Sequence, residues 1–571
     1  MCGSEAQWSP RLCPRGAHPD LHSGRFEPAG PVRTPGWTWG AALLVAMLGA
    51  CERSSQEEST EAPQVEQPAD AAVELARATP APASGEEGDR GAGAAEPRRV
   101  RLDGSSELLA LNHVSTGPRV HARHLRVWVY EQPNSSSRRL GYLRAGASSP
   151  TSASPAGFAG CPGGWHSVEP AGFVCVGRQA TLDGADPVVR AMETFRPRTE
   201  AKLPYLYGTV RNPGPVFQRL PGIEELREAE PGVDQRMLEW LDAGGEVGAS
   251  YAQDVWTWGE PPEDPRGAWT AKLTRGVPDF LQGGGVVPNP HLGARPQTLV
   301  IDRMRPKVGY AILDTFFHEG RRYGLTTHAE LVPTDRLRPI QGSDFQGVRI
   351  GVDVEFPFAF VRRPEAKFVD ASGADAGAAT YRGVLRLTGK QKFFGKVLHY
   401  EAEDGRYISD RHASRLDPAK RMPGWAKAGE KWIDINITKQ TLMLYEGTTA
   451  VFATLVSTGE AGLASAETTT ATRRGIFRIH TKHVTATMAS NESGEEFELR
   501  DVPYVQYFEA DGYALHGAYW HDRFGMPKSR GCINLTPEDA RRVFHWTDPQ
   551  VPTGWHGALL PLRGTVVFIH P

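Results

Sequence analysis

The segment from His516 to Asn534 contains a candidate nucleophile and a candidate base. His516-Gly517 begins sixteen residues before the cysteine of Ser529-Arg530-Gly531-Cys532-Ile533-Asn534. A thiol attacks a carbonyl only as the thiolate, so it needs an imidazole within hydrogen-bond reach and backbone N–H groups that hold the oxyanion. Because this segment can supply all three, it predicts acyl transfer through a cysteine.

Each of these residues also has a plainer interpretation. A lone cysteine on a strand is more often a small core residue, but His-Gly at this distance and Ser-x-Gly directly before Cys532 favour a nucleophile. His521 suggests a metal pair with Cys532, yet it lies five residues after His516, which is no same-face helix spacing, and no third ligand is evident. We therefore predict no metal and no cofactor. Three nearby aromatic residues have two alternative roles, a lid over the site or ordinary packing under a loop. They are Tyr519, Trp520 and Phe524.

Short strands must position this segment. From about residue 426, period-two alternation and hairpin-sized apolar runs predict consecutive strands at Trp432–Ile437, Thr441–Tyr445, Val451–Val456, Gly475–Ile479, Val505–Phe508 and Thr565–Ile569. One helix is predicted from Thr536, where Thr-Pro-Glu-Asp provides an N-cap, a proline in the first turn and acidic residues at the positive end of the dipole. Its buried stripe would be Ala540, Val543 and Phe544.

The chain from about Lys431 to Pro571 resembles the L,D-transpeptidase (YkuD) catalytic domain. The resemblance rests on Trp-Ile-Asp-Ile-Asn-Ile followed by Gln-x-Leu-x-Leu-Tyr, on Ser457-Thr458-Gly459 after the third strand, and on the core motif His-Gly…Ser-x-Gly-Cys-x-Asn. It covers about a quarter of the protein. It implies a mostly-β fold, a sandwich or barrel with one short helix, and a cysteine at the floor of an open cleft.

Carried over by position, the resemblance makes Cys532 the nucleophile and His516 the base, with the Gly517 carbonyl orienting the imidazole. Backbone N–H groups of the loop before and at the cysteine would form the oxyanion hole, and two further side chains would shape that loop by hydrogen bonds. The predicted site therefore comprises Cys532, His516, Gly517, Ser529, Arg530, Gly531 and Asn534.

Two positions depart from the family pattern. Arg530 stands where many members have histidine. Arginine cannot serve as a base at physiological pH, but it could attract a substrate carboxylate. The usual Thr-Pro-x-Gly before the central strand is Thr472-Arg473-Arg474-Gly475 in this chain. These changes bear on substrate preference and on one turn, and they leave the thiol chemistry intact.

The resemblance implies a substrate among peptidoglycan stem peptides. The thiolate would displace the terminal D-alanine of a donor tetrapeptide, and an amine of a second stem would resolve the thioester. A catalytically inactive wall-binding scaffold and a cysteine peptidase acting on the same polymer are the alternatives. Trapping by a carbapenem, which family members usually accept, would separate the scaffold from the enzyme.

The composition of the whole chain indicates the number of domains, the class of partner and the overall fold class. At 571 residues the chain is too long for one domain, and we expect three folded units plus a tail. The formal net charge of -3 provides no broad basic field, so we predict no nucleic-acid partner. With 62 glycines and 45 prolines, turns and short strands are favoured over long helices, and the overall fold class is mostly β.

The N-terminal region predicts export and lipid anchoring. The apolar run Trp39–Ala50 is too short to span a bilayer and fits an export signal. Leu48-Gly49-Ala50-Cys51 looks like a bacterial lipobox, so residues 1–51 are predicted to be a leader and Cys51 the lipid-bearing residue. A short buried helix with a chance cysteine is the alternative. Residues 52–100 lack a folding core and predict a disordered tether to a membrane, on the periplasmic side of the cell envelope.

Two further regions lie between the tether and the C-terminal domain. Residues 101–185 alternate short β-like runs with turns and resemble a bacterial SH3-like module, a small antiparallel barrel. Cys161 and Cys175 within it are predicted to form a disulfide, which leaves Cys532 unpaired. Residues 186–425 predict an uncharacterised α+β region with helical periodicity in Asp186–Phe195 and Gly222–Leu241, and a possible second SH3-like unit at 380–415.

Overall fold

The computed structural model describes residues 117–193, 196–242, 276–288, 298–490, 497–510, 512–559 and 564–571. The predicted leader with Cys51 and the tether of residues 52–100 lie outside this part of the chain. Strands are the main element of the described residues, as the short apolar runs and frequent turn residues predict. Among the same residues, no helix is both long enough and apolar enough to cross a bilayer.

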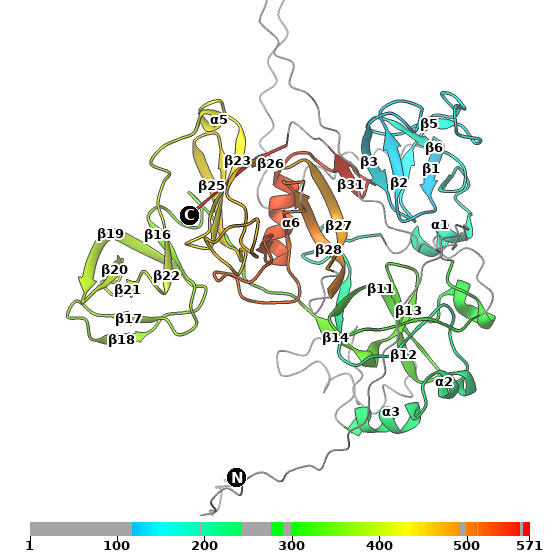
Figure 1. The fold of residues 1–571 in the computed structure, drawn as a ribbon, viewed down its shortest axis with the longest axis horizontal. Coiled ribbons are helices and arrows are strands. Elements are labelled where there is room, and N and C mark those ends of the chain that lie inside the picture. The colour runs from blue at the N-terminus through cyan, green and yellow to red at the C-terminus, as the bar shows by residue number, and fades with distance from the viewer. Residues whose placement is uncertain are drawn as a thin grey trace, which may run out of the picture. The chain divides into compact units, whose positions relative to one another are not determined.

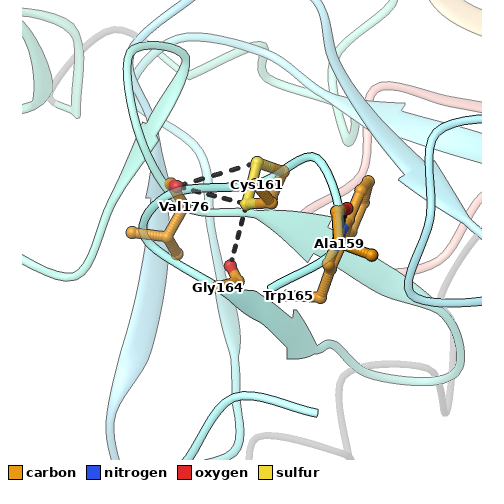
Figure 2. The surroundings of a disulfide bond; sticks show 6 residues. Ala159, Cys161, Gly164, Trp165 and Val176 are labelled. Atoms are coloured by element: carbon orange, nitrogen blue, oxygen red, sulfur yellow. Dashed lines mark hydrogen bonds between the residues drawn. A yellow bond between two sulfur atoms is a disulfide. The ribbon is translucent and has the colours of Figure 1, made fainter. Parts of the chain in front are cut away.

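The first module is built from antiparallel strands. They are β1 Arg119–Ala122, β2 Val127–Tyr130, β3 Arg139–Leu143, β4 Ser148–Pro150, β5 Trp165–Ser167, β6 Phe173–Cys175 and β7 Ala180–Thr181. β4, β1 and β7 form one open sheet and β3, β2, β6 and β5 belong to another, so the closed barrel that we expected is not formed. The predicted disulfide between Cys161 and Cys175 is confirmed, and it joins the loop before β5 to the end of β6 (Figure 2).

Residues 187–340 combine helices with a mainly antiparallel sheet. The elements are α1 Pro187–Glu193, β8 Leu206–Val210, β9 Pro215–Phe217, α2 Ile223–Ala229, α3 Val233–Asp242, the 3-10 helix η3 Asp279–Gly284, β10 Val300–Arg303, β11 Val308–His318, β12 Arg321–Thr326, β13 Leu331–Pro333, the 3-10 helix η4 Thr334–Arg336 and β14 Leu337–Ile340. The helical periodicity of Gly222–Leu241 corresponds to two helices. The two helices are separated at Pro231-Gly232, where Gly232 has a φ of 78°.

A second strand module follows. Its strands are β16 Phe358–Val361, β17 Lys367–Val369, β18 Asp375–Ala378, β19 Val384–Phe394, β20 Val397–Ala402, β21 Tyr407–Ser409 and β22 Ala413–Leu416, in the order β18-β17-β21-β20-β19-β16-β22. The sequence analysis placed the start of this module at residue 380. The module in fact starts well before that residue. β18 was not predicted because three of its four residues are exposed and carry no apolar alternation.

The C-terminal domain consists of two sheets with helix α6 between them (Figure 1). One sheet has the order β15-β25-β24-β23-β32-β26, from β15 Val348–Arg349, β23 Lys431–Asn436, β24 Thr441–Glu446, β25 Thr449–Leu455, β26 Gly475–Arg478 and β32 Val566–His570. The other contains β27 Thr481–Ser490, β28 Phe497–Tyr507, β29 Ala514–Gly517, β30 Ile533–Leu535 and β31 Gly557–Leu559. A short helix, α5 Gly424–Lys427, precedes β23. All six strand segments predicted from the sequence lie in these sheets.

Helix α6, Pro537–Trp546, confirms the predicted helix and its capping. The Thr536 side chain accepts a hydrogen bond from the backbone N–H of Asp539 over 3.2 Å. The predicted stripe of Ala540, Val543 and Phe544 is buried in the core between the sheets. Burial of a valine or phenylalanine side chain contributes about 1.5–3 kcal/mol each, so this stripe fixes the helix on the back of the site strands.

The first module and the C-terminal domain share one sheet. Gly141 and Tyr142 of β3 pair with Ala558 and Gly557 of β31. A Cβ on Gly141 would lie 2.2 Å from the Gly557 carbonyl oxygen, so only glycine permits this close approach.

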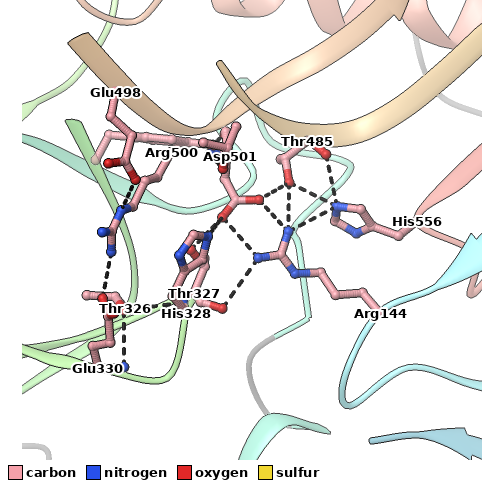
Figure 3. Close-up of polar contacts among 12 residues, drawn as sticks. Arg144, Thr326, Thr327, His328, Glu330, Thr485, Glu498, Arg500, Asp501 and His556 are labelled. Atoms are coloured by element: carbon pink, nitrogen blue, oxygen red, sulfur yellow. Dashed lines mark hydrogen bonds and ion pairs between the residues drawn. The ribbon is translucent and has the colours of Figure 1, made fainter. Parts of the chain in front are cut away.

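A buried ion pair joins the same two parts of the chain (Figure 3). The Arg144 guanidinium binds both carboxylate oxygens of Asp501, the second over 3.0 Å, and donates to the Thr327 carbonyl oxygen at 3.3 Å. Burial alone would raise the pKa of Asp501, but the Arg144 charge lowers it below its ordinary value. The pair therefore connects the first module, the middle region and the C-terminal domain.

Candidate active site

Parallel pairing of β29 and β30 places Cys532 and His516 on neighbouring segments of one sheet. His516 is the register partner of Asn534, and Cys532, which directly precedes β30, lies two residues before Asn534. Register partners point to the same face of a sheet, and so do side chains two residues apart on one strand. Cys532, His516 and Asn534 therefore share one face, opposite the face covered by α6.

Cys532 is a free, partly exposed thiol. Its environment is mainly apolar, since it packs against a cluster that includes Ala514 and Val505. Burial raises the pKa of the thiol to about 11, and a hydrogen bond with the Ala514 backbone acts in the opposite direction. The thiol is thus protonated at neutral pH and becomes nucleophilic only when a base removes its proton.

His516 is buried and held in one orientation. Its Nδ1 lies 3.3 Å from the Gly517 carbonyl oxygen, the contact that the resemblance implied. Burial lowers the pKa of the imidazole to about 4, while the Gly517 carbonyl works in the opposite direction. Trp520 stacks on the ring at a centroid distance of 5.6 Å. Because Nδ1 carries the proton that the carbonyl accepts, Nε2 is the unprotonated nitrogen of the neutral ring and can act as a base.

The loop before Cys532 is shaped by Ser529 and Gly531. The Ser529 hydroxyl donates to the Cys532 carbonyl oxygen over 2.5 Å and accepts from the Gly531 N–H at 3.2 Å. Gly531 has a φ of 122°, and a Cβ there would lie 2.6 Å from the Tyr513 ring. The guanidinium of Arg530 lies 5.6 Å from the centroid of Phe497. Local hydrogen bonds and one obligatory glycine thus determine the conformation of the loop that precedes the thiol.

Asn534 contacts the second histidine near the site. Its side-chain amide nitrogen lies 2.8 Å from Nε2 of His521, whose Nδ1 accepts from the Arg523 N–H at 3.2 Å. Both ring nitrogens of His521 are therefore engaged. Within the described ranges, no cluster of three or more His, Cys, Asp or Glu side chains is arranged to hold a metal ion.

Two of the three nearby aromatic rings pack in the protein interior. Tyr519 and Phe524 are buried, and Tyr519 stacks on Tyr207 with ring centroids 4.3 Å apart. Trp520 is the ring that borders the site, through its stack on His516. Of the two interpretations left open, ordinary packing describes Tyr519 and Phe524, and Trp520 shields the base from water.

Residues outside the predicted site anchor the nucleophile loop. The Thr458 carbonyl oxygen accepts hydrogen bonds from the N–H groups of Lys528 and Ser529, at 2.9 and 3.0 Å. Gln440 holds Thr458 in turn, accepting from its N–H at 2.9 Å. Thr472 donates to the Gly531 carbonyl oxygen at 2.8 Å and accepts from the Gly459 N–H at 2.9 Å. The Ser-Thr-Gly motif and the altered turn marked these segments in the sequence. Neither pattern predicts which residues they hydrogen-bond.

Comparison with known proteins identifies the class of this domain. Residues 430–569 match the family model of the L,D-transpeptidase catalytic domain, YkuD. This part of the chain is therefore an L,D-transpeptidase catalytic domain. No curated protein matched the chain.

Solved structures of L,D-transpeptidases are similar to part of the chain. A mutant of the Enterococcus faecium enzyme is 21% identical, with 25% of this chain and 50% of that chain covered and a TM-score of 0.19. The Stackebrandtia nassauensis enzyme is 26% identical over 27% of this chain and 58% of that chain, with a TM-score of 0.18. L,D-transpeptidase 3 from Mycobacterium tuberculosis is 16% identical over 32% and 79%, with a TM-score of 0.20. The match thus spans about half the length of the Enterococcus faecium chain.

Proposed function

We propose that the protein is a peptidoglycan L,D-transpeptidase that cross-links stem peptides through a thioester on Cys532. The observation that carries the proposal is the placement of Cys532 and His516 on one face of adjacent strands inside the matched domain. A nucleophile and an oriented neutral base are the two groups that acyl transfer requires.

The first half-reaction forms the thioester. Nε2 of His516 takes the thiol proton as Sγ of Cys532 attacks the carbonyl carbon of the donor residue. Backbone N–H groups of the loop at Arg530 to Cys532 stabilise the oxyanion. When the tetrahedral intermediate collapses, the bond to the terminal D-alanine breaks, and the imidazolium gives its proton to the departing amine.

The second half-reaction transfers the acyl group. A side-chain amine of a second stem attacks the thioester carbonyl, His516 takes the amine proton, and the thiolate leaves and is reprotonated. The product is a direct link between two stems. Water in place of the amine would give hydrolysis of the donor, which is the peptidase alternative.

The test is to incubate the soluble chain with purified tetrapeptide muropeptides and to measure dimers and released D-alanine by mass spectrometry. Dimers that form with the parent chain and not with Cys532→Ala are expected. Release of D-alanine without dimers would support the peptidase, and no reaction with either substrate or imipenem would support the inactive scaffold. Dimers formed equally by Cys532→Ala would contradict the assignment of the nucleophile.

We also propose that the protein acts on the periplasmic side of the cell envelope, anchored through a lipid on Cys51. The support is the pattern Leu48-Gly49-Ala50-Cys51 after an apolar run. Mass spectrometry of the mature N-terminus should find a diacylated Cys51. A peptide from upstream of Cys51 in the mature protein would contradict the anchor.

A further inference from the structure

The segment of residues 520–522 follows β29 and contacts the site at two points. Trp520 stacks on His516 with ring centroids 5.6 Å apart. Nε2 of His521 lies 2.8 Å from the side-chain amide nitrogen of Asn534. Segment 520–522 therefore determines what surrounds the base and the site asparagine.

Side chains hold this segment in place. On one side of it, the Ala518 N–H donates to the Leu535 carbonyl oxygen at 2.9 Å. On the other side, the Gly525 N–H donates to the Val456 carbonyl oxygen at 2.9 Å. Between these two bonds, the segment is held by its own side chains and by a side chain of the second strand module. The position of segment 520–522 therefore depends on those partners.

The partner from the second strand module is Arg382, in the turn between β18 and β19. Its guanidinium pairs with the Asp522 carboxylate at 2.7 Å and also donates to the Asp522 carbonyl oxygen. The Asp522 side chain is 59% exposed, so the ion pair alone would contribute little. The bond to the carbonyl oxygen is different, because it restrains the backbone of the segment directly.

Arg382 is itself fixed by its surroundings. Its guanidinium carbon lies 4.6 Å from the ring centroid of Tyr381, 5.6 Å from that of Phe345 and 5.9 Å from that of Phe524. It also donates to the Ser343 hydroxyl at 3.3 Å. A planar guanidinium enclosed by rings loses little freedom when it forms hydrogen bonds. The contact with the segment is thus built into the fold.

Two further arginines of the second module pack against the chain that follows the segment. Nη1 of Arg363 lies 2.8 Å from Sδ of Met526. Gly525 has a φ of 93°, and a Cβ there would lie 2.9 Å from Cβ of Arg362. The module therefore contacts this stretch of chain over several residues, and Arg382 is the contact that lies nearest to the base in the sequence.

We propose that Arg382 is a positioning residue, through which the second strand module holds segment 520–522 against the active site. This inference rests on the proposed function and adds to it a role for the second module, which acts on His516 through Trp520. Arg382 and Asp522 take no part in the chemistry themselves. If the segment moves away, the imidazole loses its stacked ring and its fixed orientation, so proton transfer from the thiol slows.

The experiment measures the rate of imipenem acylation against pH in the parent chain and in variants of this contact. Arg382→Ala should slow acylation at pH 7 by about tenfold, because loss of positioning at a distance still misplaces the base. The acid limb of its rate profile should move from near pH 4 toward pH 6.5, because His516 becomes hydrated. Arg382→Lys should recover part of the rate, since its ammonium still pairs with the Asp522 carboxylate.

Two more variants control for damage to the fold. Asp522→Ala changes an exposed side chain, and a severalfold loss of rate in this variant tests the same contact if Arg382→Ala does not fold. Lys367→Ala breaks an exposed ion pair with Asp375 in the same module, 2.7 Å long, and should leave the rate and the profile unchanged. Equal slowing by Lys367→Ala and Arg382→Ala would overturn the proposal, because general loosening of the module would then explain both.

The remaining outcomes separate this proposal from the proposed function. If imipenem acylates every variant at the parent rate, the positioning role is wrong and the enzyme stands. A loss confined to stem-peptide donors would show that the module binds substrate, and it would also overturn the positioning role. If the parent chain reacts with neither imipenem nor a donor, the proposed function fails. NMR titration of His516 in a histidine-labelled chain then decides, and an equal pKa in the parent and in Arg382→Ala would overturn the inference.

Discussion

The hydroxyl of Thr472 donates a hydrogen bond to the carbonyl oxygen of Gly531, 2.8 Å away. Because it also accepts from the Gly459 N–H, Thr472→Val leaves two backbone groups beside the nucleophile loop without their partner. We expect a loss of about 1–3 kcal/mol in the free energy of unfolding and a severalfold slower acylation by imipenem. Thermal unfolding and stopped-flow kinetics measure the two effects. Thr468→Val, at an exposed threonine of the same segment, should change neither.

Gly531 is required for its backbone conformation and for the space beside it. In Gly531→Ala the φ of 122° is unfavourable, and the new Cβ would lie 2.6 Å from the Tyr513 ring. We expect a folded protein whose imipenem acylation is slowed by more than tenfold. Gly462→Ala provides the control, because its φ of 59° is also positive but no atom lies within 4 Å of the added Cβ. Equal rates in the two variants would show that the Gly531 conformation does not position the thiol.

The pH dependence of acylation should show a base that stays neutral well into acid. Burial lowers the pKa of His516 to about 4 and raises that of Cys532 to about 11. A lowered histidine pKa means that the unprotonated base is lost only as pH falls through that value. The rate constant for imipenem should therefore be level between roughly pH 5 and pH 10 and fall near pH 4.

Trp520→Ala tests the physical cause of this shift. Removal of the stacked ring exposes His516 to water, so its pKa should rise and the acid limb of the rate profile should move toward pH 6.5, the ordinary histidine value. A parent profile that already falls near pH 6.5 would contradict the buried, neutral base.

Arg144 and Asp501 hold the first module against the catalytic domain from within a buried site. Arg144→Ala leaves the carboxylate of Asp501 buried without its charge partner, which typically costs about 3–5 kcal/mol. Calorimetric unfolding should show this loss, and Asp501→Asn in the same chain should recover part of it. Arg138→Ala breaks the exposed pair with Glu131 and should cost no more than about 1 kcal/mol. Equal costs would mean that the buried pair does not hold the junction.

The sequence predicted best the features that depend on residues close together in the chain. Period-two alternation located the strands of the C-terminal domain, and Thr536 marked the start of its helix, because strand faces and caps depend on neighbouring residues. The predicted site residues lie together at β29, β30 and the loop before β30. Those roles stay predictions until they are measured.

Long-range pairings were beyond the same reasoning. Thr472 and Gly531 are 59 residues apart, and Arg144 and Asp501 are 357 apart, so no local pattern connects them. Pro231-Gly232 separates two helices, but the helical periodicity continues on both sides of this pair. The sequence therefore predicted one helical segment where the structure has two. The shifted pKa values of Cys532 and His516 arise from burial by distant segments, which only the fold reveals.

The central claim is that the sulfur of Cys532 carries the acyl group. The most direct measurement is the intact mass of the chain after rapid quenching with a tetrapeptide donor, followed by peptide mapping of the adduct. The account predicts a mass increase equal to the donor minus D-alanine, located on the peptide that contains Cys532 and absent from Cys532→Ala. An adduct on another residue, or the same adduct in Cys532→Ala, would contradict it.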